Sequence, residues 1–151
     1  MTTTEKRKPT RRGKRKVRIE AMKRAGPDHA VNTLVGGRPD LCRLEPCDTC
    51  PWRVDAVGEF PAEAFRIAAS TSYDMARNMF ACHSSGSVKP ATCAGFVLRT
   101  HHNLALRFKV AEGQIDPDRI SDGGHELHED YRAMSIANGV DADDPVLWGC
   151  R

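Results

Sequence analysis

Apolar residues recur at helical spacing in several stretches of the chain, and two of these lie near its middle. Pro61 suits the first position of a helix, where its missing N–H is not needed, and the pattern continues from 62 to about 70. A second helix is predicted to start just past Cys93 and to run to about residue 108. Leucine, phenylalanine and valine also alternate along 104–110, so this stretch would suit a strand equally well.

A third helix is predicted near the C-terminus. Ser121 or Asp122 can cap it, and Asn138-Gly139 would end it. Its apolar stripe consists of Leu127, Tyr131 and Met134. The tail from 140 to 151 is acidic, and it ends in apolar residues that could dock back on the domain, namely Val146, Leu147 and Trp148.

The N-terminal part has a different character. Residues 1–14 are rich in charge and threonine and offer nothing to bury, which predicts disorder. From 14 to 24 a short helix is predicted, because Val17, Ala21 and Met22 would share one helical face. Residues 25–40 are weakly patterned and read as a linker.

Composition indicates one modest domain with appendages. The 151 residues are 40% apolar and only 6% aromatic, so a bound metal would help a small core. Residues 1–24 carry eleven Lys and Arg against two acidic residues, whereas 25–151 carry twelve against eighteen. We therefore expect a small α+β fold, mainly α with irregular loops. It would comprise a basic arm (1–24), a linker (25–40), a four-cysteine metal-stapled domain (41–139) and an acidic tail (140–151).

Four of the six cysteines form a pattern that is typical of a metal site. Cys47 and Cys50 are separated by two residues, so one tight turn can present both thiolates to one ion. Cys82 and Cys93 could close a tetrahedral cage from further along the chain. No apolar stretch follows the charged N-terminus as it would in an export signal. We therefore expect a cytoplasmic protein with reduced thiols rather than disulfides.

The spacing leaves the metal open. The Cys47/Cys50 pair is a common zinc knuckle, but the ten residues between Cys82 and Cys93 are loose for zinc. A [4Fe–4S] cluster tolerates wider spacing, and a proline after a ligand cysteine occurs in ferredoxin-type sequences. Zinc is the first expectation and the cluster the alternative. The reserve ligands are His83 and Cys42, while Trp52 and Arg53 could shield the site and offset its charge.

No catalytic motif accompanies these cysteines. His125 and His128 are three residues apart, whereas the zincin motif needs four. The zinc deaminase pattern requires a His-x-Glu before the cysteine pair, and the upstream histidine, His29, is followed by alanine and valine. An enzymatic function is therefore not expected.

Three short motifs carry a family resemblance. They are Pro-Cys-x-x-Cys-Pro-Trp-Arg from Pro46, Cys-His at Cys82 and Cys-Ala-Gly-Phe from Cys93. In this order they resemble an uncharacterised family of small cysteine-motif proteins of actinobacteria and their phages. The resemblance spans roughly residues 45–110 and leaves the basic arm and the acidic C-terminal region outside. It supports the shared cysteines as a site and implies no activity.

Together these features predict a metal-binding module that contacts nucleic acid through its basic arm. The arm would release counterions from phosphates, giving largely sequence-independent binding. The residues expected to make these contacts are Lys6, Arg7, Lys8, Arg11, Arg12, Lys14, Arg15, Lys16 and Arg18. The alternatives are an iron–sulfur redox or regulatory protein and a phage-type adaptor that binds a host protein. No membrane association is expected, because no apolar run is long enough.

Overall fold

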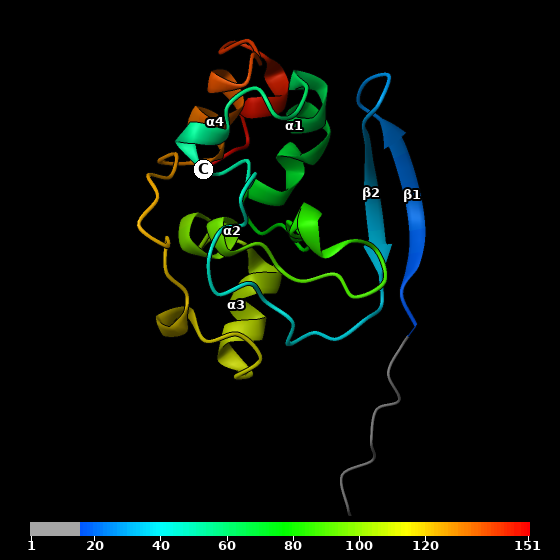
Figure 1. The fold of residues 1–151 in the computed structure, drawn as a ribbon, viewed down its shortest axis with the longest axis vertical. Coiled ribbons are helices and arrows are strands. Elements are labelled where there is room, and N and C mark those ends of the chain that lie inside the picture. Colours follow the sequence, from blue (N-terminus) through cyan, green and yellow to red (C-terminus); the bar gives the residue numbers. More distant parts are fainter. Residues whose placement is uncertain (1–15) are drawn as a thin grey trace, which may run out of the picture.

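The structure is a computed structural model that describes residues 16–151. It is a small α+β fold in which short helices surround one core and a two-stranded sheet lies along one side (Figure 1). The strands are β1 (Arg18–Arg24) and β2 (Ala30–Val35), and the helices are α1 (Ala62–Ala68), α2 (Ala94–Arg99), α3 (Leu104–Ala111) and α4 (Tyr131–Ala137). Single 3-10 turns occupy Val54–Ala56, Ala69–Ser72, His83–Ser85, Pro117–Arg119 and Pro145–Leu147. The disorder predicted for 1–14 lies outside the described residues.

The helix predicted over 14–24 is wrong where the structure describes it, because Arg18–Arg24 forms β1. Its antiparallel partner β2 lies in the segment that we expected to be an irregular linker. Val31, Thr33 and Val35 are β-branched residues that favour extended backbone, and their pairing outweighs the weak helical pattern of the preceding segment. The turn between the strands is closed by the Ala25 N–H, which donates to the His29 carbonyl at 2.9 Å.

The helix predicted after Pro61 is confirmed as α1, and the stretch after Cys93 is helical but divided. Thr100 and Asn103 are fully buried between α2 and α3. The Asn103 side chain accepts from the Leu106 N–H at 2.9 Å and so caps α3. This cap starts a new helix, so residues 104–110 form a helix and not the strand that their alternation also suited.

The last helix begins later than the sequence indicates. α4 is capped by Asp130, whose carboxylate accepts from the Ala133 N–H at 2.7 Å, and not by Ser121 or Asp122. The delay has a backbone cause, because Gly123 and Gly124 have φ of +65° and +80°. These left-handed values interrupt a right-handed helix.

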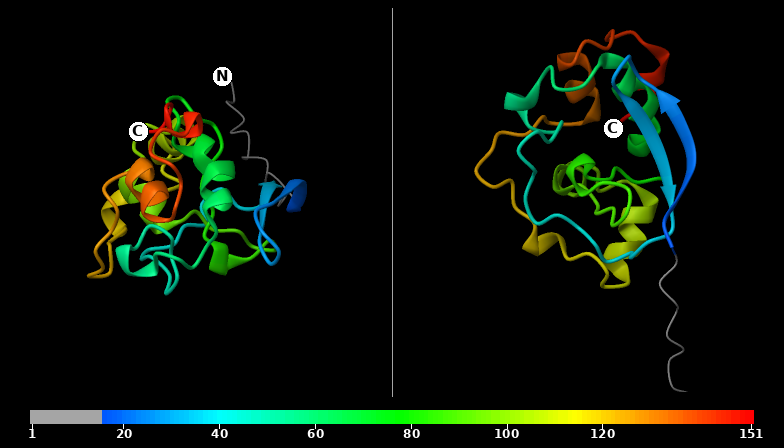
Figure 2. Two further views of the ribbon diagram at one scale, coloured as in Figure 1. Left: turned by 90° about the horizontal axis from the view of Figure 1, so that it is seen from above. Right: turned by 45° about the vertical axis from the view of Figure 1, so that its right-hand side comes forward.

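The core lies where the helices meet, and its largest buried side chains are Trp52, Phe96, Tyr131, Leu106, Met134 and Leu147. Figure 2 shows that the β1–β2 ribbon stands at the edge of this body, with β1 on its outer side. Every β1 residue is exposed, including Ile19 and Met22. Within residues 16–151, none of the helices has the length and hydropathy to cross a membrane.

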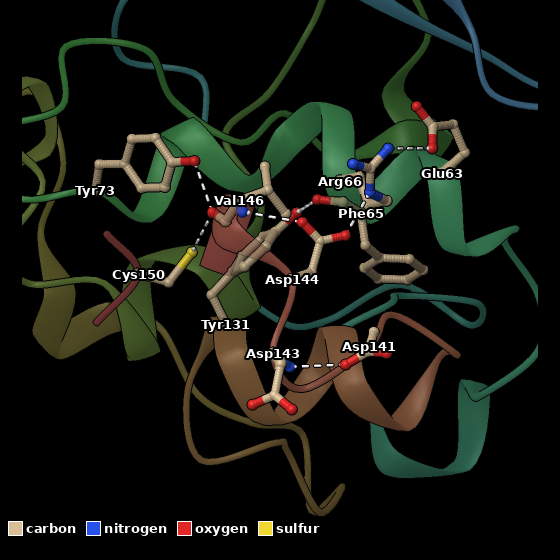
Figure 3. Close-up of polar contacts among 10 residues, drawn as sticks. All are labelled: Glu63, Phe65, Arg66, Tyr73, Tyr131, Asp141, Asp143, Asp144, Val146 and Cys150. Carbon is tan, nitrogen blue, oxygen red and sulfur yellow. Dashed lines mark hydrogen bonds and ion pairs between the residues drawn. The ribbon is translucent and has the colours of Figure 1, made fainter. Parts of the chain in front are cut away.

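The C-terminal segment packs onto the body through contacts with Arg66 of α1 and with Tyr73 (Figure 3). Arg66 pairs with Asp144 at 2.7 Å, and the Tyr73 hydroxyl donates to the Val146 carbonyl at 2.6 Å. Leu147 is buried, whereas Trp148 remains 75% exposed. The apolar end therefore docks through Leu147 rather than through the tryptophan.

Candidate metal centre

Three short extended segments bring the later cysteines to one place. The Cys82 N–H donates to the Ala91 carbonyl at 2.8 Å, and the Cys93 N–H donates to the Phe80 carbonyl at 3.0 Å. The ten residues between the two cysteines therefore form a loop that is closed by an isolated bridge between Ala81 and Thr92. The wide spacing is a property of this loop and does not separate the two thiols.

The segment that precedes the first cysteine pair joins the same ladder. The Arg43 N–H donates to the Thr92 carbonyl at 2.9 Å, and the Thr92 N–H donates to the Leu41 carbonyl at 3.0 Å. Residues 41–43 thus run beside the segment that precedes Cys93, through an isolated bridge between Cys42 and Thr92. From there the chain needs only four more residues to reach Cys47.

The Cys-x-x-Cys segment forms a tight turn around its own sulfur. The Cys50 N–H donates to the Cys47 carbonyl at 3.1 Å, and the Arg53 N–H donates to the Cys50 carbonyl at 3.0 Å. A hydrogen bond from the Cys93 thiol, aided by the backbone N–H groups of Trp52 and Arg53, lowers the pKa of Cys50 to about 7. Backbone N–H groups aimed at a sulfur stabilise the thiolate, which is the form that binds metal.

The sulfur atoms of Cys50 and Cys93 lie 3.7 Å apart. Four sulfurs arranged tetrahedrally around one zinc ion, with Zn–S bonds of about 2.3 Å, are separated by about 3.8 Å along each edge. The observed distance is close to this edge length, and it is also the distance of a hydrogen bond between two thiols. Hydrogen bonding to Cys50 and burial together raise the pKa of Cys93 well above its usual value.

Cys47 and Cys82 lie beside this pair. Burial raises the pKa of Cys47, and the neighbouring thiols of Cys82 and Cys50 raise it further. Cys50, Cys82 and Cys93 are only 1%, 4% and 3% exposed, whereas Cys47 is half-buried. The sequence-predicted ligands thus form one cluster with a single solvent-facing corner at Cys47.

The cluster is not a finished coordination cage. Among residues 16–151, no group of three or more His, Cys, Asp or Glu side chains is arranged to hold a metal ion as the side chains stand. All six cysteines of the chain are free of disulfide bonds. The structure thus shows four neighbouring thiols, of which one pair, Cys50 and Cys93, is in direct contact.

Two arginines supply positive charge at the cluster, and sequence reasoning anticipated one of them. The Arg53 Nη1 donates to the Cys47 carbonyl at 3.3 Å while the same side chain pairs with Asp55. The missed residue is Arg43, whose Nε donates to the Cys82 sulfur at 3.3 Å. Nothing local in the sequence indicates this contact, because Arg43 and Cys82 are 39 residues apart in the chain.

The two reserve ligands occupy different positions. The Nδ1 atom of His83 lies 3.8 Å from the Cys47 sulfur, and its Nε2 atom lies 2.7 Å from the Thr49 hydroxyl. Burial lowers the pKa of His83. The Cys42 thiol instead contacts the Arg43 carbonyl at 3.3 Å, and burial raises the pKa of Cys42 to about 11. His83 therefore borders the cluster at Cys47, whereas the contact of the Cys42 thiol is with a backbone carbonyl.

Trp52 covers the inner side of the cluster and explains two of the three motifs. Trp52 is fully buried, and it packs directly against the backbone of Gly95. A Cβ atom on Gly95 would lie 2.5 Å from the Trp52 Cβ. Trp52 follows the first cysteine pair, and Gly95 follows the last cysteine. Their contact therefore holds the segment of Cys47 and Cys50 in a fixed position relative to the segment of Cys93.

Residues 42–151 match the model of a family described as a family of unknown function (DUF6283). The chain belongs to this family. The resemblance drawn from the cysteine motifs is confirmed, but the match reaches Arg151, so the C-terminal region that we placed outside it belongs inside. The β1–β2 ribbon precedes the matched residues. No curated protein and no solved structure matches the chain.

Proposed function

We propose that Cys47, Cys50, Cys82 and Cys93 hold one zinc ion, and that this centre stabilises a module that contacts nucleic acid through its basic N-terminal segment. The single observation that carries the metal assignment is the 3.7 Å separation of the Cys50 and Cys93 sulfurs within a cluster of four thiols. Turning the Cys47 and Cys82 side chains toward this pair would complete the tetrahedron.

Charge balance supports a bound dication. Four thiolates around Zn²⁺ leave a net charge of about −2, which is costly in a buried place unless cations lie near. Arg43 and Arg53 are positioned to supply them. Burial and the neighbouring Cys82 thiol raise the pKa of Cys47, and a cation that replaces the thiol protons would offset both effects.

An iron–sulfur cluster remains the alternative for the same four cysteines. In a four-iron cluster each cysteine ligates a different iron, so the sulfurs are held further apart than around one ion. The short Cys50–Cys93 distance therefore favours a single ion. The half-buried Cys47 corner would make a cluster accessible to oxidants, which is what a redox or regulatory role needs.

Nucleic-acid contact is supported by the separation of charge. Residues 1–24 carry a net charge of +9, and the remainder of the chain carries −6. The described part of the basic segment, from Lys16 to Arg24, is exposed apart from the half-buried Val17. Such a segment releases counterions from phosphates, whereas the acidic body would keep away from them.

Metal analysis of anaerobically purified protein tests the centre. We expect a colourless protein with one equivalent of zinc, and Cys93→Ser should lose both the zinc and the fold because metal binding and folding are coupled. Cys42→Ser and Cys150→Ser are matched controls and should retain zinc. A brown protein containing iron would select the cluster instead, and a freshly purified protein without any metal would refute the centre.

A further inference from the structure

We infer that the β1–β2 ribbon is the element that binds nucleic acid, and that it does so in the major groove of duplex DNA. This inference rests on the proposed nucleic-acid function and names its partner. The basic residues from Lys16 to Arg24 do not form a helix or a loose tail. Three of the four, Arg18, Lys23 and Arg24, lie on the outer strand of an antiparallel pair that projects along the side of the body (Figure 1).

The dimensions of the ribbon suit that groove. Two paired strands are about 4.8 Å apart, and seven residues extend about 23 Å, which corresponds to about seven base pairs. The major groove of B-DNA is about 12 Å wide and admits a two-stranded ribbon with its side chains. The deep, narrow major groove of an RNA duplex does not.

The chemistry of the ribbon also separates duplex from single-stranded targets. Between residues 16 and 35 there is no phenylalanine, tyrosine or tryptophan. Proteins that bind single strands rely on aromatic platforms for stacking, so the ribbon lacks what that mode needs. It does carry four Lys and Arg residues against two acidic residues, and its exposed side chains include Asn32.

The strand register assigns the face that enters the groove. Ile19, Met22 and Arg24 pair with Leu34, Asn32 and Ala30 and therefore share one face. Arg18, Ala21 and Lys23 share the other face with Val35, Thr33 and Val31. Two of the residues on that second face, Val31 and Val35, are half-buried, whereas Met22 is 66% exposed. The Met22 face is the freer one, and apart from Leu34 at its far end it is open.

Charge argues against a second copy of the chain as the occupant of the free β1 edge. Pairing β1 with another β1 would bring Arg18, Lys23 and Arg24 of both copies together, and like charges facing each other across strands are destabilising. An anionic partner has no such penalty. A DNA duplex supplies phosphates on both sides of the groove.

Neighbouring substitutions on opposite faces provide the test. Met22→Asp and Ala21→Asp change the net charge equally, in adjacent exposed positions of the same strand. We would measure the affinity of the full chain for a labelled DNA duplex of about two helical turns by fluorescence anisotropy. Circular dichroism and zinc content would confirm that both variants fold.

We expect Met22→Asp to weaken binding at least tenfold more than Ala21→Asp. The wild type should prefer the DNA duplex to an RNA duplex and to a single strand of the same sequence. Equal losses in the two variants, or equal affinity for the three nucleic acids, would overturn the groove assignment while leaving the nucleic-acid function in place. Failure of the wild type to bind any of the three would overturn the proposed function itself. A wild-type dimer that Met22→Asp dissociates, without loss of DNA affinity, would identify the face as a self-association surface and also refute the inference.

Discussion

Replacing Gly95 with alanine should destabilise the protein, although helix propensity argues for the opposite. Gly95 lies in the first turn of α2, where alanine is favoured over glycine by up to about 1 kcal/mol. The new Cβ would lie 2.5, 2.7 and 3.0 Å from the Cβ, Cγ and Cδ1 atoms of Trp52. The shortest of these is 0.9 Å below the 3.4 Å at which ordinary contact begins.

Neither Trp52 nor the backbone of Gly95 can move to relieve this clash without a substantial cost in free energy. Trp52 is 0% exposed and packs edge-on against Phe80 and Tyr131, with ring centroids 6.1 and 5.9 Å away. Overpacking of a tight core costs about 1–3 kcal/mol, and we take the upper value because the whole indole is enclosed. After the gain in propensity is subtracted, the free energy of unfolding should fall by about 2 kcal/mol.

Urea unfolding followed by far-UV circular dichroism would measure this loss. Gly26→Ala is the matched control, because its Cβ would lie 3.7 Å from Pro61 in ordinary contact, and it should change stability by less than about 0.5 kcal/mol. The zinc affinity of Gly95→Ala should fall as well, since Trp52 and Gly95 hold the two ligand segments in register. A variant as stable as the wild type, or more stable, would show that the Trp52–Gly95 contact does not fix the centre.

Three further substitutions address the cluster, the core and the dependence on pH. Arg43→Ala removes the hydrogen bond to the Cys82 sulfur and should lower the zinc affinity about tenfold to hundredfold, as the loss of a group that orients a metal ligand does. Competition with a chromophoric chelator would measure the affinity. An unchanged affinity would contradict the role of Arg43 at the proposed zinc site. Tyr131→Phe removes a buried donor to the Phe65 carbonyl and should cost about 1–3 kcal/mol in urea unfolding. Burial lowers the pKa of His128 below 6.5, so the unfolded chain binds its proton more readily than the folded protein, and stability should decrease as the pH falls below that value. His128→Gln should flatten this decrease in thermal melts between pH 7 and about 5, and an unchanged slope would assign it to other groups.

The parts of the fold that the sequence predicts are those with strong local signals. α1 begins directly after Pro61, one residue later than the predicted first position, and the cysteine motifs identify the family. The errors occur where a weak helical pattern of apolar residues is outweighed by strand pairing with a segment later in the chain. Residues 18–24 have too few apolar positions to distinguish a helix from an exposed strand, and β2 decides the outcome.

In the candidate site, too, local sequence patterns identify some residues, whereas others depend on tertiary contacts. Spacing alone identifies Cys47 and Cys50, but the closeness of Cys82 and Cys93 depends on a ladder that involves residues 41–43. Arg43 could not be singled out, because nothing local indicates that its side chain reaches a sulfur 39 residues away. A residue whose contacts lie far along the chain cannot be identified from the spacing of residues in the sequence.

The ribbon and the cysteine cluster are joined by a row of three rings, which predicts that they influence each other. The His29 ring, at the turn of the ribbon, packs edge-on against Phe60 with centroids 5.9 Å apart, and Phe60 packs against His83 at 4.9 Å. His83 in turn borders Cys47. If the four cysteines hold the proposed metal, its chelation should therefore loosen the ribbon by freeing the loop that carries His83.

Hydrogen exchange can measure this coupling, because the paired amides of β1 and β2 report directly on opening of the ribbon. In the wild type we expect chelator to reduce their protection. In Phe60→Ala the middle ring is missing, so protection should already be low with metal bound and should change little on chelation. If the wild-type ribbon amides exchange equally fast with and without metal, the ring contacts transmit nothing and the ribbon is an independent element. Equal protection in Phe60→Ala and wild type with metal bound would instead show that the remaining contacts, such as the packing of Val17 against Gly37, suffice to hold the ribbon.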